Sequence, residues 1–152
     1  MSILNLFKNT QAEKPSGTFN HSILGELRLS EKKDCWLGKF STIQFSIKYE
    51  GKSEPPENLL FLAQKLAEKP SELLSLHTQI KKAAASIIVN DQTPLTELDS
   101  LVISKISLYN HRRNSKKPRM NIELKSDNRE LEWYAVTNEF DLMRVSLKNS
   151  YA

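Results

Sequence analysis

Three histidines and a single cysteine are the side chains in this sequence best suited to hold a metal ion or to attack a substrate. His21, His77 and His111 stand far apart, and none has a second ligand at the i, i+4 spacing that a zinc site on a helix uses. His77 falls on the apolar side of an expected helix, so we interpret it as a hydrogen-bonded structural residue. We expect no metal and no other cofactor.

Cys35 has no base or orienting group in a recognisable motif beside it. We therefore interpret Cys35 as a small apolar side chain that packs in the interior. One cysteine cannot form an internal disulfide, which is typical of a reducing compartment, and we expect a cytoplasmic protein.

Paired carboxylates could serve acid–base chemistry if they were buried together. Acidic pairs occur at Glu97 and Asp99, at Asp127 and Glu130, and at Glu139 and Asp141. All three fall at expected turns or element starts, where solvation and capping are their ordinary roles. The four glycines are also too scattered for a phosphate-cradling loop. We therefore expect a protein that is not an enzyme.

The stretch YNHRRNSKKPRM, residues 109–120, is the most basic part of the chain. Its five cations are Arg112, Arg113, Lys116, Lys117 and Arg119. The net charge is +4, so the rest of the chain is close to neutral. Three interpretations remain open: a solvated connection in which Pro118 prevents a regular ladder, an electrostatic handle for an acidic protein, and a nucleic-acid contact.

Large aromatic side chains on strands are further candidates for contact with a partner. Trp36, Trp133 and Tyr134 either complete the core or lie on an open face of the sheet. Because side chains alternate along a strand, one of Trp133 and Tyr134 must face away from the helices in a two-layered fold.

The elements that must position these residues are visible as two periodicities. A period of two predicts strands over 21–30, 35–40 and 41–51, with a charged turn at 31–34. A helical period predicts helices over 55–69 and 71–90, separated by Pro70.

Residues 91–100 are expected to form a linker with one helical turn, and 101–109 a segment whose second half is a strand. Further strands are predicted over 121–127, 130–138 and 141–149, with 109–120 as a connection. The order of three strands, two helices and four strands predicts an α+β fold: an antiparallel sheet with both helices packed on one face. Residues 1–20 would be a flexible lead-in and 21–150 one domain.

The sequence resembles small bacterial domains that share a hairpin like ILGELRL…WLGKF, two helices and a C-terminal run of strands like LVISKISLYNHRR…NIELKSD…LEWYAV…LMRVSLK. Some of these are similar to immunity proteins of bacterial toxin systems. The resemblance covers residues 22–149 and brings no catalytic residues. Relatives often carry acidic and histidine residues in the late strands, whereas this chain has Arg144 and Lys148 in the last one.

These observations favour a non-enzymatic protein-binding module that blocks a toxin by steric occlusion, through contacts from Trp36, Trp133, Tyr134 and the basic stretch. Its partner would be a protein with an acidic surface. The alternative is a nucleic-acid-binding accessory protein that uses residues 112–119. A third possibility is a ligand pocket between sheet and helices. No run of about 18 apolar residues occurs, so we expect no membrane span.

Overall fold

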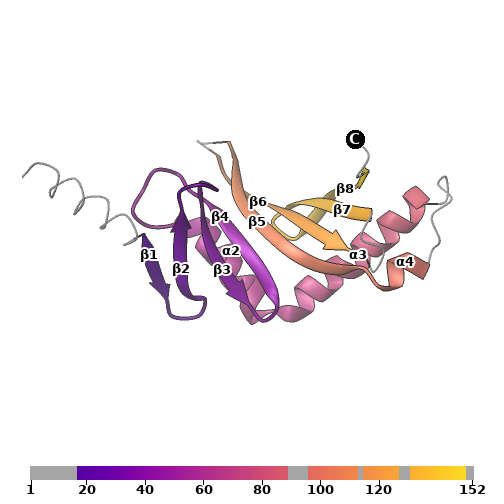
Figure 1. Ribbon diagram of the computed structural model, residues 1–152, viewed down its shortest axis with the longest axis horizontal. Coiled ribbons are helices and arrows are strands. Elements are labelled where there is room, and N and C mark those ends of the chain that lie inside the picture. Colours follow the sequence, from indigo (N-terminus) through magenta and orange to yellow (C-terminus); the bar gives the residue numbers. More distant parts are fainter. Residues whose placement is uncertain (1–16, 89–95, 113–114, 127–130, 150–152) are drawn as a thin grey trace, which may run out of the picture.

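The structure is a computed structural model, and it describes residues 17–88, 96–112, 115–126 and 131–149. Eight strands form a single sheet in which the strands follow one another in chain order (Figure 1). They are β1 (Thr18–His21), β2 (Gly25–Ser30), β3 (Cys35–Phe40), β4 (Ile43–Lys48), β5 (Val102–Arg112), β6 (Ser115–Lys125), β7 (Leu131–Asn138) and β8 (Asp141–Asn149). The α+β class is confirmed, but four strands precede the helices instead of three.

The additional strand is β1, which lies partly within the expected lead-in. Residues 18–20 pair with β2, so the sheet begins before His21. This strand escaped the sequence analysis because it is short and has no alternation of apolar residues. Residues 1–16 of the expected lead-in lie outside the described residues. The tight turns that follow include Asp34 and Ser41, both at positive φ, at 53° and 56°.

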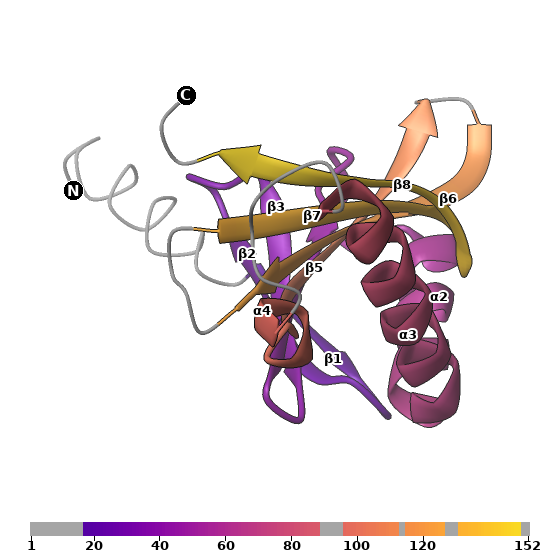
Figure 2. The same ribbon diagram turned by 90° about the vertical axis from the view of Figure 1, so that its right-hand side faces the viewer.

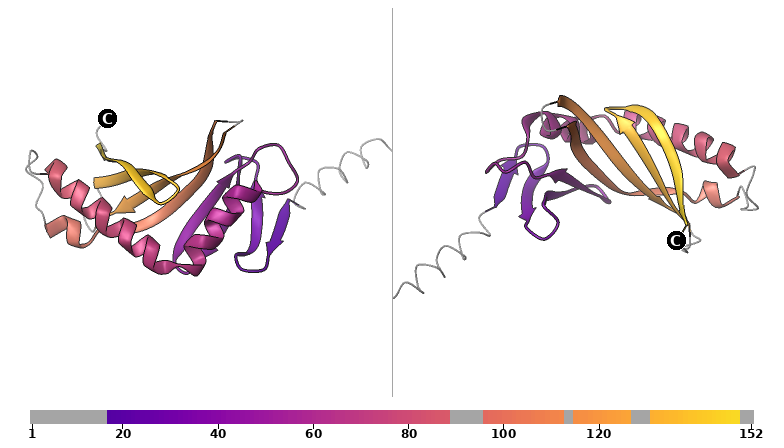
Figure 3. Two further views of the ribbon diagram at one scale, coloured as in Figure 1. Left: turned by 180° about the vertical axis from the view of Figure 1, so that it is seen from behind. Right: turned by 90° about the horizontal axis from the view of Figure 1, so that it is seen from above.

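Two helices cover one face of the sheet, as predicted (Figure 3). α2 spans Glu57–Glu68 and α3 spans Pro70–Ile88. Lys69 leaves the helical region, with φ −123° and ψ 72°. The reason is the following proline, which disfavours helical geometry in the residue before it and starts the next helix well. A single turn, α4 (Thr96–Asp99), matches the turn expected in the linker.

The strand pairing departs from the prediction at the centre of the sheet. β4 and β5 run parallel, with Ser46 opposite Ser107, while every other pair of neighbouring strands is antiparallel. The two helices between them carry the chain back to the end of the sheet at which β4 begins. β5 can therefore run in the same direction as β4. Side-chain periodicity carries no information about strand direction, so the sequence could not show this.

The basic stretch also differs from expectation, because it is a hairpin and not an irregular connection. β5 and β6 pair as far as Arg112 and Ser115, and their end extends beyond the neighbouring strands (Figure 2). Pro118 lies opposite Asn110, beside a register shift between Asn110 and Arg112. Proline lacks an N–H, and a bulge is one place where a strand tolerates that loss.

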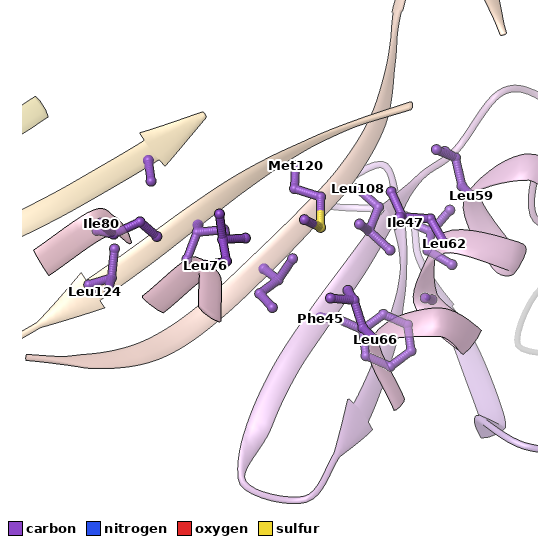
Figure 4. Close-up of a cluster of buried hydrophobic side chains, with 14 of the residues drawn as sticks. Phe45, Ile47, Leu59, Leu62, Leu66, Leu76, Ile80, Leu108, Met120 and Leu124 are labelled. Atoms are coloured by element: carbon purple, nitrogen blue, oxygen red, sulfur yellow. The ribbon is translucent and has the colours of Figure 1, made fainter. Parts of the chain in front are cut away.

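One apolar cluster fills the space between the sheet and the helices (Figure 4). Phe45 and Ile47 from β4 and Ile106 and Leu108 from β5 are all at most 1% exposed. The helices contribute leucines such as Leu66 to the same cluster. The core therefore joins the strands that precede the helices to those that follow them.

Candidate binding face of the sheet

The sheet has a second face, which none of the described helices covers (Figure 3). We call this the open face. Alternation places on it the side chains that do not point into the core. Among the described strand residues, nine Lys and Arg side chains lie on it: Arg28, Lys39, Lys48, Lys105, Lys117, Arg119, Lys125, Arg144 and Lys148. The carboxylates of the described strands on this face are Glu26, Glu123, Glu132 and Asp141. Positive charge therefore prevails over the whole face.

This distribution was not predicted from the sequence. The basic character was assigned to residues 109–120, because charges were summed along the chain. Acidic residues on the helices and turns balance the strand lysines in such a sum, although the fold places them elsewhere. The available signal was the alternation of cations with core residues, as in Lys105-Ile106 and Arg144-Val145.

The open face is hollowed where β3, β4 and β5 lie side by side. One hollow of about 500 Å³ lies over these strands, and a second of about 530 Å³ adjoins it over β2 and β3. The first is lined by Lys33, Cys35, Ser46, Lys48, Lys105, Ser107, Leu108 and Tyr109. Lys33 and Lys105 line both. The short side chains of Cys35, Ser46 and Ser107 form the depression, since long side chains stand around them.

Few of the cations on this face are neutralised by a neighbour. Two ion pairs occur among the described residues: Arg28 Nε lies 2.9 Å from Glu26 Oε1, and Lys48 Nζ lies 2.7 Å from Asp34 Oδ2. All four side chains are about half exposed or more, so these pairs are easily exchanged for other partners.

Tyr134 lies on the open face, as one of the two alternatives for β7 required. Its hydroxyl donates to Glu132 Oε2 at 3.3 Å, and Lys148 Nζ stands 5.6 Å from its ring centre. Partial burial raises the pKa of Tyr134; the hydrogen bond from Lys148 opposes this rise, and the nearby Glu123 carboxylate adds to it. The ring is half-buried and available to a partner.

Trp36 and Trp133, in contrast, are core residues and each is 1% exposed. Both rings complete the core, which is one of the two alternatives from the sequence, and their role as partner contacts stays a prediction. Trp36 lies opposite Ile47 and Trp133 opposite Leu147, so both point toward the helices. Gly38, two residues after Trp36, also faces the core, where the ring of Phe45 occupies the space that a side chain would need.

The basic hairpin contributes unevenly to the open face. The side chains of Arg112, Arg113 and Lys116 lie outside the described residues, and Lys117 is exposed. Arg119 is half-buried, and its guanidinium Nη1 donates to His111 Nδ1 at 2.8 Å. Arg119 lies opposite Tyr109 on the neighbouring strand.

His77 and Cys35 are two further candidates for chemistry from the sequence. His77 Nε2 lies 2.7 Å from the Leu101 carbonyl, to which it can donate, in line with the predicted structural role. Cys35 is buried, with 8% of its surface exposed. In the part of the chain that the structure describes, no group of three metal-ligating side chains comes together. None of the described helices is long and apolar enough to cross a bilayer.

Comparison with known proteins finds no match to this chain among family models, curated proteins or solved structures.

Proposed function

We propose that this protein is a non-enzymatic binding module whose open face receives an acidic surface of a partner protein. The observation that supports the proposal is the excess of nine cations over four carboxylates among the described strand residues of the open face. Complementary charge accelerates the encounter of two proteins and selects among partners. Tyr134 and the exposed part of Leu37 add the contact area that charge alone does not supply.

The resemblance to immunity proteins suggests the biological setting. In that setting the protein acts in the bacterial cytoplasm and covers an acidic region of a toxin, so that the toxin cannot reach its target. A broad, shallow sheet face suits steric occlusion, because blocking requires area and not a chemical group.

A nucleic acid is the second candidate, and the spread of cations over several strands favours it more than a single basic loop would. Two features favour a protein. Glu123 and Glu132 stand among the cations, where they would repel phosphates. The tyrosine hydroxyls on the face are engaged, with Tyr109 donating to Asn121 Oδ1 at 3.2 Å, and no row of stacking rings occurs on the described strands.

Affinity capture with charge-matched variants tests the proposal. The open-face variant replaces Lys39, Lys125 and Arg144 by Gln. The control replaces Lys52, Lys69 and Lys82, which are exposed residues away from this face, by Gln. Capture from nuclease-treated lysate is followed by cross-linking to identify the lysines in contact. We expect an acidic protein that the wild type and the control retain and the open-face variant loses.

Two results would refute the proposal. Equal loss in both variants would show that only net charge matters. Capture that occurs from untreated lysate but not from nuclease-treated lysate, with affinity that falls steeply as salt rises, would assign the face to nucleic acid instead.

A further inference from the structure

The hollow over β3, β4 and β5 is arranged as an anion pocket. Parallel pairing sets Ser46 directly opposite Ser107. Lys48 follows Ser46 by two residues and Lys105 precedes Ser107 by two, so one cation stands on each side of the two hydroxyls along the strand direction. Two residues of a strand span about 7 Å, which a lysine side chain can reach across. Both ammonium groups can therefore approach an anion seated on the serines.

Groups in this pocket lack partners within the protein. Ser46 is 6% exposed, and its hydroxyl has no hydrogen-bond partner among the described residues. Lys105 lies opposite Glu123 of β6, but its ammonium forms no ion pair with that carboxylate or with any other in the described part of the chain. The Ser46 and Lys105 side chains both line the hollow, so a ligand can reach them without breaking a hydrogen bond or an ion pair within the described residues. The hollow therefore offers a ligand both a positive charge and a hydroxyl group that can donate a hydrogen bond.

The side-chain types favour a phosphoryl group over a carboxylate. The cations around the hollow are Lys33, Lys48 and Lys105, and no arginine lines it. Planar carboxylates match the planar fork of arginine, whereas lysine acts as a point charge that suits a dianion. A tetrahedral phosphoryl group has three terminal oxygens, enough to accept from the serine hydroxyls and from the ammonium groups together.

We propose that this hollow binds the phosphoryl group of a small organic phosphate. The adjoining hollow provides space for the organic part, because the partly exposed Leu37 lines it together with Gln44. The Lys48–Asp34 pair is exposed and would exchange its carboxylate for the ligand. This inference does not depend on a protein partner.

Calorimetric titration of the full chain at low ionic strength tests it, with inorganic phosphate, glucose 6-phosphate, glucose and succinate as probes. We expect saturable binding of the two phosphates and none of glucose or succinate. Lys105→Gln and Ser46→Ala should each weaken binding roughly tenfold, because each removes a donor to a charged group. Lys82→Gln, with the same charge change far from the hollow, should bind as the wild type does.

Several outcomes would overturn the assignment. They are equal affinity for succinate, no saturation by either phosphate, or an equal loss in the Lys82→Gln control. Thermal melts of each variant show whether it is folded, and an unfolded Ser46→Ala variant would leave Lys105→Gln, at a half-exposed position, as the decisive comparison. These titrations contain no partner protein, so their failure would leave the proposed function standing.

Discussion

At the scale of single residues, the two tryptophans are equally buried, but their replacement should change the free energy of unfolding by different amounts. Trp36 and Trp133 are each 1% exposed, but the Trp36 Nε1–H is buried without a hydrogen-bond partner among the described residues. Replacement by Phe leaves a cavity at either position. At Trp36 it also removes an unsatisfied donor, so we expect Trp36→Phe to cost about 1 kcal/mol less than Trp133→Phe.

Urea unfolding of the two variants measures this difference directly. The slope of the free energy of unfolding against urea should be the same for both, which would show that the denatured states are comparable. A Trp36→Phe variant that is less stable than Trp133→Phe would mean that the indole N–H has a partner after all, such as a buried water.

Tyr134 should make the stability of the protein sensitive to alkaline pH. Its pKa is raised in the folded state, mainly by burial, above the ordinary value of about 10. The folded state therefore holds this proton more tightly than the unfolded state does. The resulting contribution is complete below pH 10 and is lost as the pH rises through the folded pKa.

The free energy of unfolding, followed from about pH 8 to about pH 11, should therefore fall more in the wild type than in Tyr134→Phe. Other lysines and tyrosines also titrate there, but their effect is common to both proteins and cancels in the difference. Parallel curves would show that Tyr134 is equally easy to ionise in the two states.

At the scale of elements, the packing of β3 on β4 depends on Gly38, which has no side chain. A Cβ at Gly38 would stand 2.5 Å from Leu27 Cδ2 and closer still to the Phe45 ring, which stacks on Phe40 at 5.0 Å. We expect Gly38→Ala to destabilise the fold by about 1–3 kcal/mol through overpacking.

The matched test adds Phe45→Leu, which makes room beside Gly38. In denaturant unfolding, the double variant should be more stable than the sum of the two single effects predicts. Strictly additive changes in the free energy of unfolding, or a Gly38→Ala variant as stable as the wild type, would contradict overpacking. Gly38 would then be needed for its backbone conformation or not needed at all. This packing also explains why Trp36 and Gly38 stand two residues apart in β3, since both positions face the core.

The elements also show what the sequence could reveal. The helices were predicted because their apolar period is continuous and Pro70 separates them. Strands such as β4 were predicted because Phe45 and Ile47 alternate with polar residues. The hairpin was missed because the cations near Pro118 were interpreted as a loop, although strand side chains that face solvent are free to be charged.

The candidate site was predicted less well, and for a related reason. Tyr134, Lys117 and Arg119 were named from composition, but Lys48 and Lys105 were not, since neither belongs to a motif. They come together only through the parallel pairing of β4 and β5, between residues about sixty positions apart. Contacts of this separation are set by the fold and not by local sequence.

At the scale of the whole molecule, the arrangement predicts one cooperative unfolding transition. The strands before the helices join those after them through four parallel residue pairs, Gln44–Ile47 with Lys105–Leu108. Alone, that short ladder would be a weak link. The apolar cluster is continuous across it, however, and α2 contacts both β5 and β6 while its leucines pack in the same cluster as β4. Neither half has a core that is independent of the other.

The two tryptophans report on the two halves separately, because Trp36 lies in β3 and Trp133 in β7. Fluorescence of Trp133→Phe follows the first half, and fluorescence of Trp36→Phe follows the second. In each variant we expect the fluorescence transition in urea to coincide with the loss of far-ultraviolet circular dichroism, since a shared core unfolds as a unit. A fluorescence midpoint that precedes the circular dichroism midpoint in either variant would show that this half unfolds first. The open face would then be built on two units that move independently, and a partner or phosphate bound across β4 and β5 would stabilise their junction more than the rest of the protein.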